Sequence, residues 1–360
     1  MELTKCKLGE LITQRREKND GSDLPICGVS KDGLIPPKQK DADTSIYNVF
    51  YRDDFIFNPA RMELNSIAIN DMYDRAICSS LYEVFYVHRT DLLLPHYLKL
   101  IIRQKWFTRY CEFLGQGSAR EYCRFGNISE IEIEFPPIEE QQKIVDYNTA
   151  IENRIALKQK INDNLQATAQ AIYKKHFIED VDVSKLPSDW RIDILENVAN
   201  LSAGGDRPGT YSDYSTDICS IPIYSNGIEN EGLYGFTDKA KIFDECVTVS
   251  ARGTVGYVFL REEPYVPIVR LISVIPDTTQ LTAKYLFFAL NAIDLQSTGT
   301  SQQQITVPDF KKRQILIPSK EAINKFMLLI EPLFAAIKQN KIEINALLAL
   351  QDNCLTILSR

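Results

Sequence analysis

The chain has 360 residues, 44% of them hydrophobic and 25% charged, and its formal net charge at pH 7 is −7. This length and apolar content suit two cored domains with connecting elements and are too large for one ordinary core. No run of about 18 apolar residues occurs, and the first residues are charged and polar. Neither a membrane span nor a signal peptide is therefore predicted, and a cytoplasmic location is expected.

The acidic total, taken alone, argues against a nucleic-acid partner. Phosphate binding nevertheless depends on the local density of Lys and Arg, because screened charges act within about 8 to 10 Å. Total charge therefore leaves nucleic-acid binding open.

Residues 1–135 are predicted to form a mixed α/β domain. Short strand-like runs at residues 47–51, 68–69 and 83–87 are separated by Gly, Pro, Asn and Asp turns, and a helix is predicted near residues 95–113. Residues 99–124 carry six cationic and two anionic side chains with aromatic residues between them. This stretch fits a nucleic-acid face, but it equally fits an amphipathic helix with a solvated outer face.

A long helix is predicted over residues 137–177. Pro137 stands in its first turn, Glu139 and Glu140 follow, and Lys174 and Lys175 close it, which is the charge order that the helix dipole favours. A polar linker then leads into a second mixed α/β domain that ends at residue 317. Its strand-like runs are residues 246–250, 256–260 and 269–275, and its helix lies near residues 282–295.

A second long helix is predicted over residues 319–360, with Ser319 as a possible N-cap. Pro332 is expected to kink this helix or to divide it near Glu331, because Pro lacks a backbone donor. The predicted segments are thus residues 1–135, 136–178, 179–317 and 318–360.

Both long helices show a heptad seam with a polar break at the same repeat position, Lys158 and Asn340. The simplest arrangement pairs the helices as a coiled coil, a rod of about 60 Å. The alternative is that each helix packs on its own domain. The seam and partner-docking residues are Ile144, Ile151, Ile155, Lys158, Leu165, Ile172, Leu333, Ile337, Asn340, Ile344 and Leu347.

The two halves repeat each other at a separation of 182 residues. Ile133-Glu-Phe-Pro corresponds to Ile315-Leu-Ile-Pro, and Gly117-Ser-Ala-Arg corresponds to Gly299-Thr-Ser-Gln. Ala60-Arg61 resembles Ala251-Arg252 at a different offset, so the loops differ in length. A repeat of this size predicts two equivalent working parts on two equivalent spacers.

Enzyme motifs are incomplete throughout the sequence. Gly204-Gly-Asp-Arg-Pro-Gly-Thr lacks the Lys of a phosphate loop, Gly115-Gln-Gly-Ser-Ala lacks the spacing of a nucleophile elbow, and Asn58-Pro-Ala-Arg lacks the second Pro and the aromatic residue of adenine methyltransferases. The eight cysteines include no Cys-x-x-Cys pair and the three histidines do not cluster with acids. We therefore predict reduced thiols, structural histidines, no catalytic residue and no metal site.

Several motifs in one order resemble the specificity subunit of type I restriction-modification systems. The first half resembles a diverged recognition domain and the second half a typical one, so the resemblance spans essentially the whole chain. The motifs are Asp54-Phe-Ile-Phe-Asn-Pro-Ala-Arg, Gly115-Gln-Gly-Ser-Ala-Arg, Phe135-Pro-Pro-Ile-Glu-Glu-Gln-Gln-Lys-Ile, Leu186-Pro-Ser-Asp-Trp, Ile221-Pro-Ile-Tyr-Ser-Asn-Gly, Val249-Ser-Ala-Arg-Gly-Thr-Val-Gly, Tyr285-Leu-Phe-Phe-Ala-Leu, Gly299-Thr-Ser-Gln-Gln-Gln-Ile and Ile315-Leu-Ile-Pro.

The resemblance implies an α+β fold with two target recognition domains, each followed by a long helix, the two helices forming an antiparallel coiled coil. It implies that each domain reads one half of a bipartite double-stranded DNA target and that two modification subunits dock on the chain. It also implies that S-adenosylmethionine, ATP and Mg²⁺ bind to modification and restriction subunits and not to this chain, which has no catalytic role. The alternative is a coiled-coil scaffold protein that does not bind DNA directly.

The candidate DNA-binding residues lie on predicted polar and basic loops, with ordinary turn chemistry as the alternative. Gln suits adenine edges and Arg suits guanine edges or phosphate. The candidates are Arg61, Ser118, Ala119, Arg120, Tyr122 and Arg124 in the first domain and Tyr224, Ser225, Asn226, Arg252, Thr300, Ser301, Gln302, Gln303 and Gln304 in the second.

Overall fold

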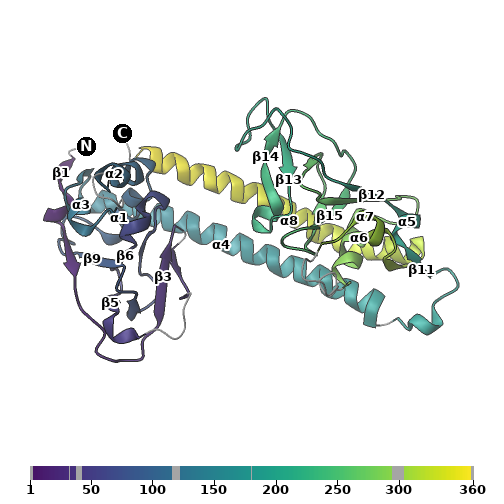
Figure 1. Ribbon diagram of the computed structural model, residues 1–360, viewed down its shortest axis with the longest axis horizontal. Coiled ribbons are helices and arrows are strands. Elements are labelled where there is room, and N and C mark those ends of the chain that lie inside the picture. The colour runs from purple at the N-terminus through teal and green to yellow at the C-terminus, as the bar shows by residue number, and fades with distance from the viewer. Residues whose placement is uncertain are drawn as a thin grey trace. The chain divides into compact units, whose positions relative to one another are not determined.

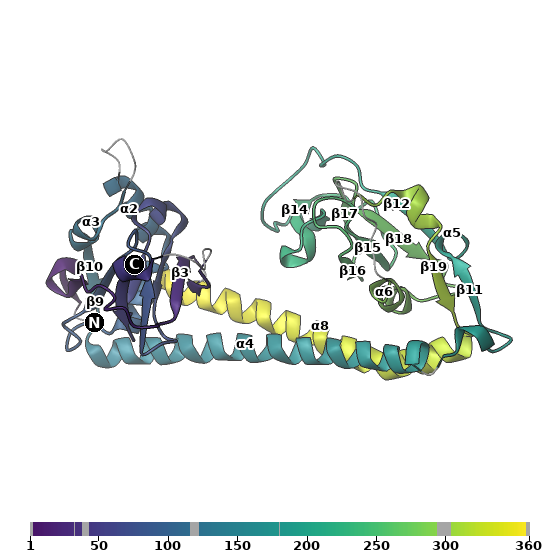
Figure 2. The same ribbon diagram turned by 60° about the horizontal axis from the view of Figure 1, so that its bottom comes forward.

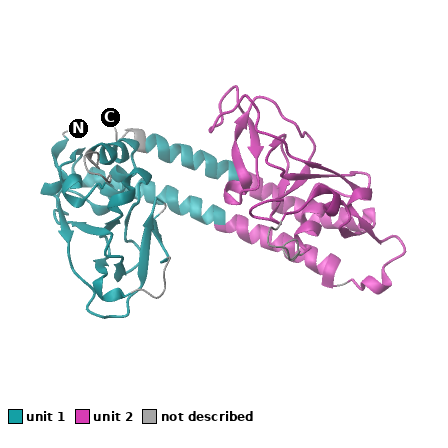
Figure 3. Ribbon diagram, in the orientation of Figure 1, with its two compact units in different colours: residues 1–159, 341–360 teal, residues 160–340 magenta. Residues whose placement is uncertain are grey.

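The computed structural model describes residues 3–31, 33–37, 43–115, 122–179, 181–293 and 304–357. The chain forms two compact units (Figure 3). Unit 1 comprises Met1–Gln159 and Lys341–Arg360, and unit 2 comprises Lys160–Asn340. Each unit contains an α+β domain and a part of both long helices.

Unit 1 contains three small sheets (Figure 1). One is antiparallel in the order β2-β9-β6-β7, a second has the order β4-β3-β8-β5 with β3 and β8 parallel, and β1 pairs with β10. Their bounds are β1 Thr4–Lys7, β2 Ile12–Arg15, β3 Ile26–Ser30, β4 Gly33–Ile35, β5 Asn48–Tyr51, β6 Phe55–Phe57, β7 Ile67–Ile69, β8 Arg75–Cys78, β9 Glu83–Val87 and β10 Glu132–Phe135.

The helix predicted over residues 95–113 is two helices, α1 (Pro95–Ile102) and α2 (Lys105–Gly115), followed by α3 (Phe125–Ser129). A tight turn separates α1 from α2, in which the Gln104 amide donates to the carbonyl of Ile101 (3.0 Å) and the Phe107 amide to that of Gln104 (3.1 Å). Because of this turn, Ile101 in α1 and Phe107 in α2 both reach the core formed with Phe55 and Phe85. A single straight helix is therefore a wrong prediction.

Unit 2 repeats this plan. A four-stranded antiparallel sheet has the order β12-β18-β15-β16, a three-stranded sheet has the order β14-β13-β17, and β11 pairs with β19. Pairs β1-β10 and β11-β19 correspond, since each joins an early strand of its domain to the strand before a long helix. The bounds are β11 Arg191–Ile194, β12 Ala199–Ala203, β13 Ile221–Tyr224, β14 Leu233–Thr237, β15 Cys246–Val249, β16 Val258–Arg261, β17 Val266–Pro267, β18 Ile272–Pro276 and β19 Gln314–Ile317.

Three short helices complete the domain of unit 2: α5 (Leu195–Val198), α6 (Ala283–Asn291) and α7 (Val307–Lys311). α6 is buried from Ala283 to Leu290 and contributes to the main core of the unit. Its one buried cation, Lys284, lies 3.1 Å from a carboxylate oxygen of Glu262 and 3.2 Å from one of Glu331. Such pairing is what keeps a buried ammonium group charged.

The two long helices are α4 (Ile138–Lys174) and α8 (Lys320–Ile357). Ser319 is the N-cap predicted for α8, because its Oγ accepts a hydrogen bond from the Ala322 amide at 3.3 Å. Pro332 lies inside α8, which continues through it. The helix is therefore not divided near Glu331, and the alternative, a kink at Pro332, stays a prediction. The missing donor of Pro332 affects one hydrogen bond in 38 residues of helix.

α4 and α8 contact each other within each unit (Figure 2). In unit 1, Lys158 Nζ lies 2.9 Å from a carboxylate oxygen of Glu343, and Gln351 Nε2 donates to Glu152 at 3.3 Å. Later residues of α4 thus meet earlier residues of α8, so the helices run antiparallel there. In unit 2, Asn340 Nδ2 donates to Asn162 Oδ1 at 2.8 Å.

The predicted seam residues are buried or half-buried. Ile151, Ile155 and Asn340 are buried. The remaining members are half-buried: Ile144, Lys158, Leu165, Ile172, Leu333, Ile337, Ile344 and Leu347. Both polar breaks have partners on the opposite helix, Lys158 with Glu343 and Asn340 with Asn162. Satisfied polar groups of this kind fix the register of paired helices.

Candidate nucleic-acid interface

The Asn226 side chain connects three loops in unit 2. Its Nδ2 donates to the carbonyl of Val269 at 2.6 Å, and its Oδ1 accepts from the Ala251 amide at 2.8 Å. The Asn226 carbonyl also accepts from Thr254 Oγ1 at 2.5 Å. The loop after β13 is thereby tied to the loop after β15 and to the turn before β18.

Two glycines allow these loops to approach closely. A Cβ on Gly232 would lie 2.5 Å from the Ser225 carbonyl oxygen, and Gly232 has a φ of +82°. A Cβ on Gly204 would lie 2.7 Å from the carbonyl carbon of Pro267. Any other residue at these positions would push the loops apart.

The turn that contacts Gly204 has an unusual backbone. Val269 and Arg270 have φ values of +52° and +64°, which lie in the left-handed region. Their amides donate to the carbonyls of Gly205 (2.9 Å) and Gly204 (3.1 Å). For a β-branched residue this conformation costs on the order of 1 to 3 kcal/mol, and such strain occurs preferentially at functional sites.

The buried side chain of Arg261 contacts the same loops. Its side chain is 3% exposed, its guanidinium lies 3.6 Å from the centroid of the Tyr224 ring, and its Nη2 donates to the Glu231 carbonyl at 2.6 Å. Its Nε donates to Thr248 Oγ1 at 3.0 Å. Burial lowers the pKa of Arg261, although these acceptors retain a charged guanidinium. Arg261 is the last residue of β16 and belongs to none of the sequence motifs, so the sequence does not single it out.

The predicted polar residues Tyr224, Ser225 and Asn226 are all half-buried and all take part in this framework. The Ser225 amide donates to the Gly232 carbonyl at 2.8 Å, and the Tyr224 ring packs on Arg261 and Tyr265. Their predicted contact with DNA remains a prediction. What the structure adds is that they fix the positions of neighbouring loops.

Arg252 and Arg270 project from the connected loops as exposed cations. Within the part of the chain that the structure describes, neither guanidinium has an ion-pair or hydrogen-bond partner. Lys241 is a third exposed cation, whose Nζ lies 3.4 Å from the position of a Cβ on Gly205. Three exposed cations thus lie on these loops although the chain is acidic overall.

The segment that follows the predicted Gly-Thr-Ser-Gln-Gln-Gln motif meets the same place. The Ile305 amide donates to the Ala251 carbonyl at 3.0 Å, beside Arg252, and the preceding Gln304 is exposed. Four predicted residues of this motif lie outside the described residues: Thr300, Ser301, Gln302 and Gln303.

Unit 1 repeats this connection. The Cys123 amide donates to the Pro59 carbonyl at 3.0 Å, and Cys123 precedes Ile305 by the same 182 residues that separate the other repeated motifs. Arg61, the counterpart of Arg252, is exposed in the 3-10 segment Pro59–Leu64, and among the described residues its guanidinium has no partner. Ser118, Ala119 and Arg120 fall outside the described residues.

Tyr122 and Arg124 flank Cys123, and their side chains contact each other. The Arg124 guanidinium lies 5.4 Å from the Tyr122 ring centroid and 3.4 Å from a carboxylate oxygen of Glu83. Because Glu83 already partly neutralises Arg124, Arg61 is the stronger phosphate candidate in unit 1.

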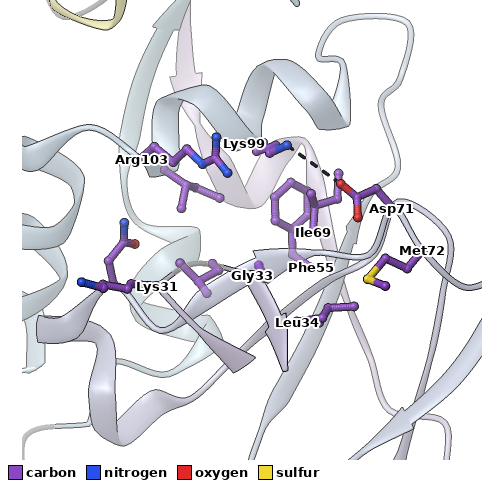
Figure 4. A pocket seen from close by; sticks show the side chains of 13 residues that line it. Lys31, Gly33, Leu34, Phe55, Ile69, Asp71, Met72, Lys99 and Arg103 are labelled. Atoms are coloured by element: carbon purple, nitrogen blue, oxygen red, sulfur yellow. Dashed lines mark ion pairs between the residues drawn. The ribbon is translucent and has the colours of Figure 1, made fainter. Parts of the chain in front are cut away.

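A cavity of about 170 Å³ also lies in unit 1, between the β3-β4 hairpin and α1 (Figure 4). Lys99 in α1 and Arg103 directly after α1 line it, but Lys99 Nζ is 3.4 Å and Arg103 Nη1 is 2.5 Å from carboxylate oxygens of Glu152. Burial opposes the ionisation of Glu152, yet the two cations hold its pKa below the usual value. These charges are already compensated, so the amphipathic-helix interpretation holds for Lys99 and Arg103.

Other kinds of site find no support among the described residues. No group of three or more His, Cys, Asp and Glu side chains there could hold a metal ion, and every cysteine is a free thiol. No described helix combines the length and apolar character needed to cross a membrane.

The fold and the paired loops define a class of protein with two repeated α+β domains, each joined to a long helix and each presenting an exposed arginine. The family model for the type I restriction modification DNA specificity domain matches residues 6–167 and 187–348. Two copies of this domain cover most of the chain, and the chain therefore belongs to the family of type I restriction-modification specificity subunits.

Individual relatives agree with this assignment. The chain is 28% identical over 208 residues to a Mycoplasma pneumoniae protein named "Putative type I specificity subunit", and the match covers 58% of this chain and 56% of that protein. It is 23% identical over 296 residues to the type I restriction enzyme MjaIX specificity subunit of Methanocaldococcus jannaschii, with 73% and 67% covered. The chain thus spans little more than half the length of the first relative.

A solved structure has the same fold. The type I restriction-modification S subunit from M. genitalium superimposes with a TM-score of 0.60 over 99% of this chain and 96% of that one, at 15% sequence identity. The α+β architecture with a long helix after each domain is therefore that of a specificity subunit.

Proposed function

We propose that this chain is the DNA-reading subunit of a type I restriction-modification complex and that its two units read the two halves of a bipartite target. In this proposal α4 and α8 form a coiled coil that sets the gap between the half-targets. The chain itself catalyses nothing. Modification subunits carry S-adenosylmethionine and transfer methyl groups to adenine, and restriction subunits use ATP and Mg²⁺.

One repeated observation carries the proposal. In both units a backbone hydrogen bond of 3.0 Å ties the segment after the predicted recognition loop to the segment that bears an exposed arginine, Arg61 or Arg252. Phosphate groups bind such cations, and two copies suit two separated stretches of one duplex. Within the described part of the chain, three other basic residues, Arg124, Lys99 and Arg103, already face carboxylates.

The long helices also keep surface available for partner subunits. Leu157 in α4 is 58% exposed, and Leu328 and Ile342 in α8 are 76% and 55% exposed. These apolar side chains lie outside the seam, so the contact between α4 and α8 does not account for them. Exposed apolar side chains on a paired helix suit docking of further helices, and we assign this role to two modification subunits.

Footprinting tests the bipartite proposal. The chain assembled with its modification subunits should protect two short DNA segments separated by an unprotected or weakly protected gap. A single continuous protected segment would contradict reading by two units. No protection at all, with intact assembly, would instead favour a scaffold that does not bind DNA directly.

A further inference from the structure

Arg270 is a basic residue of unit 2 that no sequence motif marks, because residues 269–275 are predicted to be one strand. In the structure β18 begins at Ile272, and Val269 and Arg270 form the turn before it. The Arg270 side chain is consequently exposed on a loop instead of lying on the face of a sheet.

The Asn226 side chain forms hydrogen bonds with both the loop that carries Arg270 and the loop that carries Arg252. One end of its amide accepts from the Ala251 amide, one residue before Arg252, and the other end donates to the Val269 carbonyl, one residue before Arg270. The Asn226 side-chain amide therefore fixes each loop at the residue that directly precedes its arginine.

The backbone of the turn is held from the other side as well. The Val269 and Arg270 amides donate to the carbonyls of Gly205 and Gly204, and Gly204 has no space for a Cβ against Pro267. Left-handed φ values at two consecutive residues without Gly persist only when the surroundings over-determine them. This conformation keeps a cation on a rigid turn with no described acid to neutralise it.

We propose that Arg270 is a second phosphate-contacting residue of unit 2 and that Asn226 is the positioning residue that holds Arg270 beside Arg252. The inference rests on the proposed DNA-reading function, since its ligand is the phosphate backbone of the same duplex. Two guanidinium groups on connected loops contact the backbone with a fixed spacing. Such contacts set the register of the domain on the duplex without reading bases.

The salt dependence of binding measures these contacts. For the chain assembled with its modification subunits on target DNA, the slope of log K against log salt falls by about 0.9 for each phosphate that a variant no longer neutralises. We expect Arg252→Ala and Arg270→Ala each to reduce the slope by about that amount, and the double variant by about twice as much. Arg270→Lys should retain most of the slope, because it keeps the charge.

Asn226→Asp separates the two hydrogen bonds of the Asn226 side chain. The carboxylate still accepts from the Ala251 amide but can no longer donate to the Val269 carbonyl. Asn226→Asp should therefore remove the contribution of Arg270 and leave that of Arg252. In this background Arg270→Ala should change the slope no further, whereas Arg252→Ala should still reduce it.

Asn230→Asp is the matched control. Asn230 is exposed on a nearby turn, has a φ of +49° that Asp tolerates, and gains the same negative charge. Its slope should remain within error of the unsubstituted chain, and melting curves of all variants should show folded protein.

Several results would overturn the inference. An unchanged slope for Arg270→Ala, beside a reduced one for Arg252→Ala, would remove Arg270 from the interface. Full additivity of Asn226→Asp and Arg270→Ala would remove the positioning role. If the unsubstituted complex did not bind DNA, the proposed function itself would fail, and that outcome is distinguishable from both.

Discussion

At the scale of single residues, the described polar side chains of unit 2 divide into those that build the loops and those that project from them. Asn226 and Arg261 use their donors and acceptors within the protein. Arg252 and Arg270 project from the backbone that these residues hold. The division explains why an isolated motif such as Ser-Asn-Gly cannot by itself identify the atoms that touch a ligand.

Arg261→Met tests this supporting role. The substitution removes hydrogen bonds to Thr248 and the Glu231 carbonyl from a side chain that is 3% exposed, while the Glu231 carboxylate keeps access to water. We expect the free energy of unfolding of unit 2 to fall by about 2 kcal/mol, because the Thr248 hydroxyl and the Glu231 carbonyl each lose a hydrogen-bond donor. Differential scanning calorimetry should show a drop of about 4 to 8 °C in its melting temperature.

Lys312→Met is the control for Arg261→Met. Lys312 is exposed, and the described residues include no partner for its ammonium group. Its effect should lie within about 0.5 kcal/mol. Equal melting temperatures for the two variants would show that Arg261 does not support the loops.

At the scale of elements, the sequence predicts periodic structure better than turns. The seam residues of α4 and α8 follow from heptad spacing, because Ile151 and Ile155 repeat at the helical period and are buried. The sequence does not predict the turn at Gln104 or the left-handed residues Val269 and Arg270. The composition of these two stretches is that of an uninterrupted helix and an uninterrupted strand. Tertiary contacts with the core and with Gly204 decide them.

The candidate site is predictable to a similar extent. Repetition points to Arg61 and Arg252 as candidates, because an Ala-Arg dipeptide occurs in both halves. Arg270 and Arg261 lack such a signal, since their positions depend on hydrogen bonds between segments far apart in sequence.

Deleting one heptad from each long helix tests the spacer role. Residues 155–161 and 341–347 include the Lys158–Glu343 contact, and the Asn162–Asn340 contact follows in antiparallel order, so their joint removal should preserve the register. Seven residues of helix span about 10.5 Å, which is about 3 base pairs at 3.4 Å each. Binding selection should yield a gap shorter by about that number.

The matched control duplicates the same two heptads. The preferred gap should then lengthen by about 3 base pairs. A gap that stays constant in both the shortened and the lengthened chain, with assembly intact, would show that α4 and α8 do not measure the distance.

At the scale of the whole molecule, the two domains share a plan but differ in their loops. Unit 1 has Asn58-Pro-Ala-Arg where unit 2 has Val249-Ser-Ala-Arg, and the Ser-Asn-Gly segment occurs only in unit 2. Two domains with the same fold and different loops are what we expect if each domain reads its own half-target.

Exchanging residues 186–317 for the matching domain of a relative tests that independence. We expect the half-target read by unit 2 to change and the other half and the gap to stay as they are. Methylation mapping of DNA from cells that express the exchanged chain with its modification subunits measures all three. A change in both halves, or in neither, would contradict modular reading.

The division of the helices between the units bears on folding during synthesis. Unit 2 is one continuous stretch, Lys160–Asn340, whereas unit 1 needs Lys341 and later residues to reach partners such as Lys158. At about 5 to 20 residues per second, the ribosome needs about 10 to 40 s to make the intervening 181 residues. The first half of α4 is therefore made long before its partner helix exists, and seam residues outside the first core, such as Ile155, remain exposed in the nascent chain while the later domain can already fold.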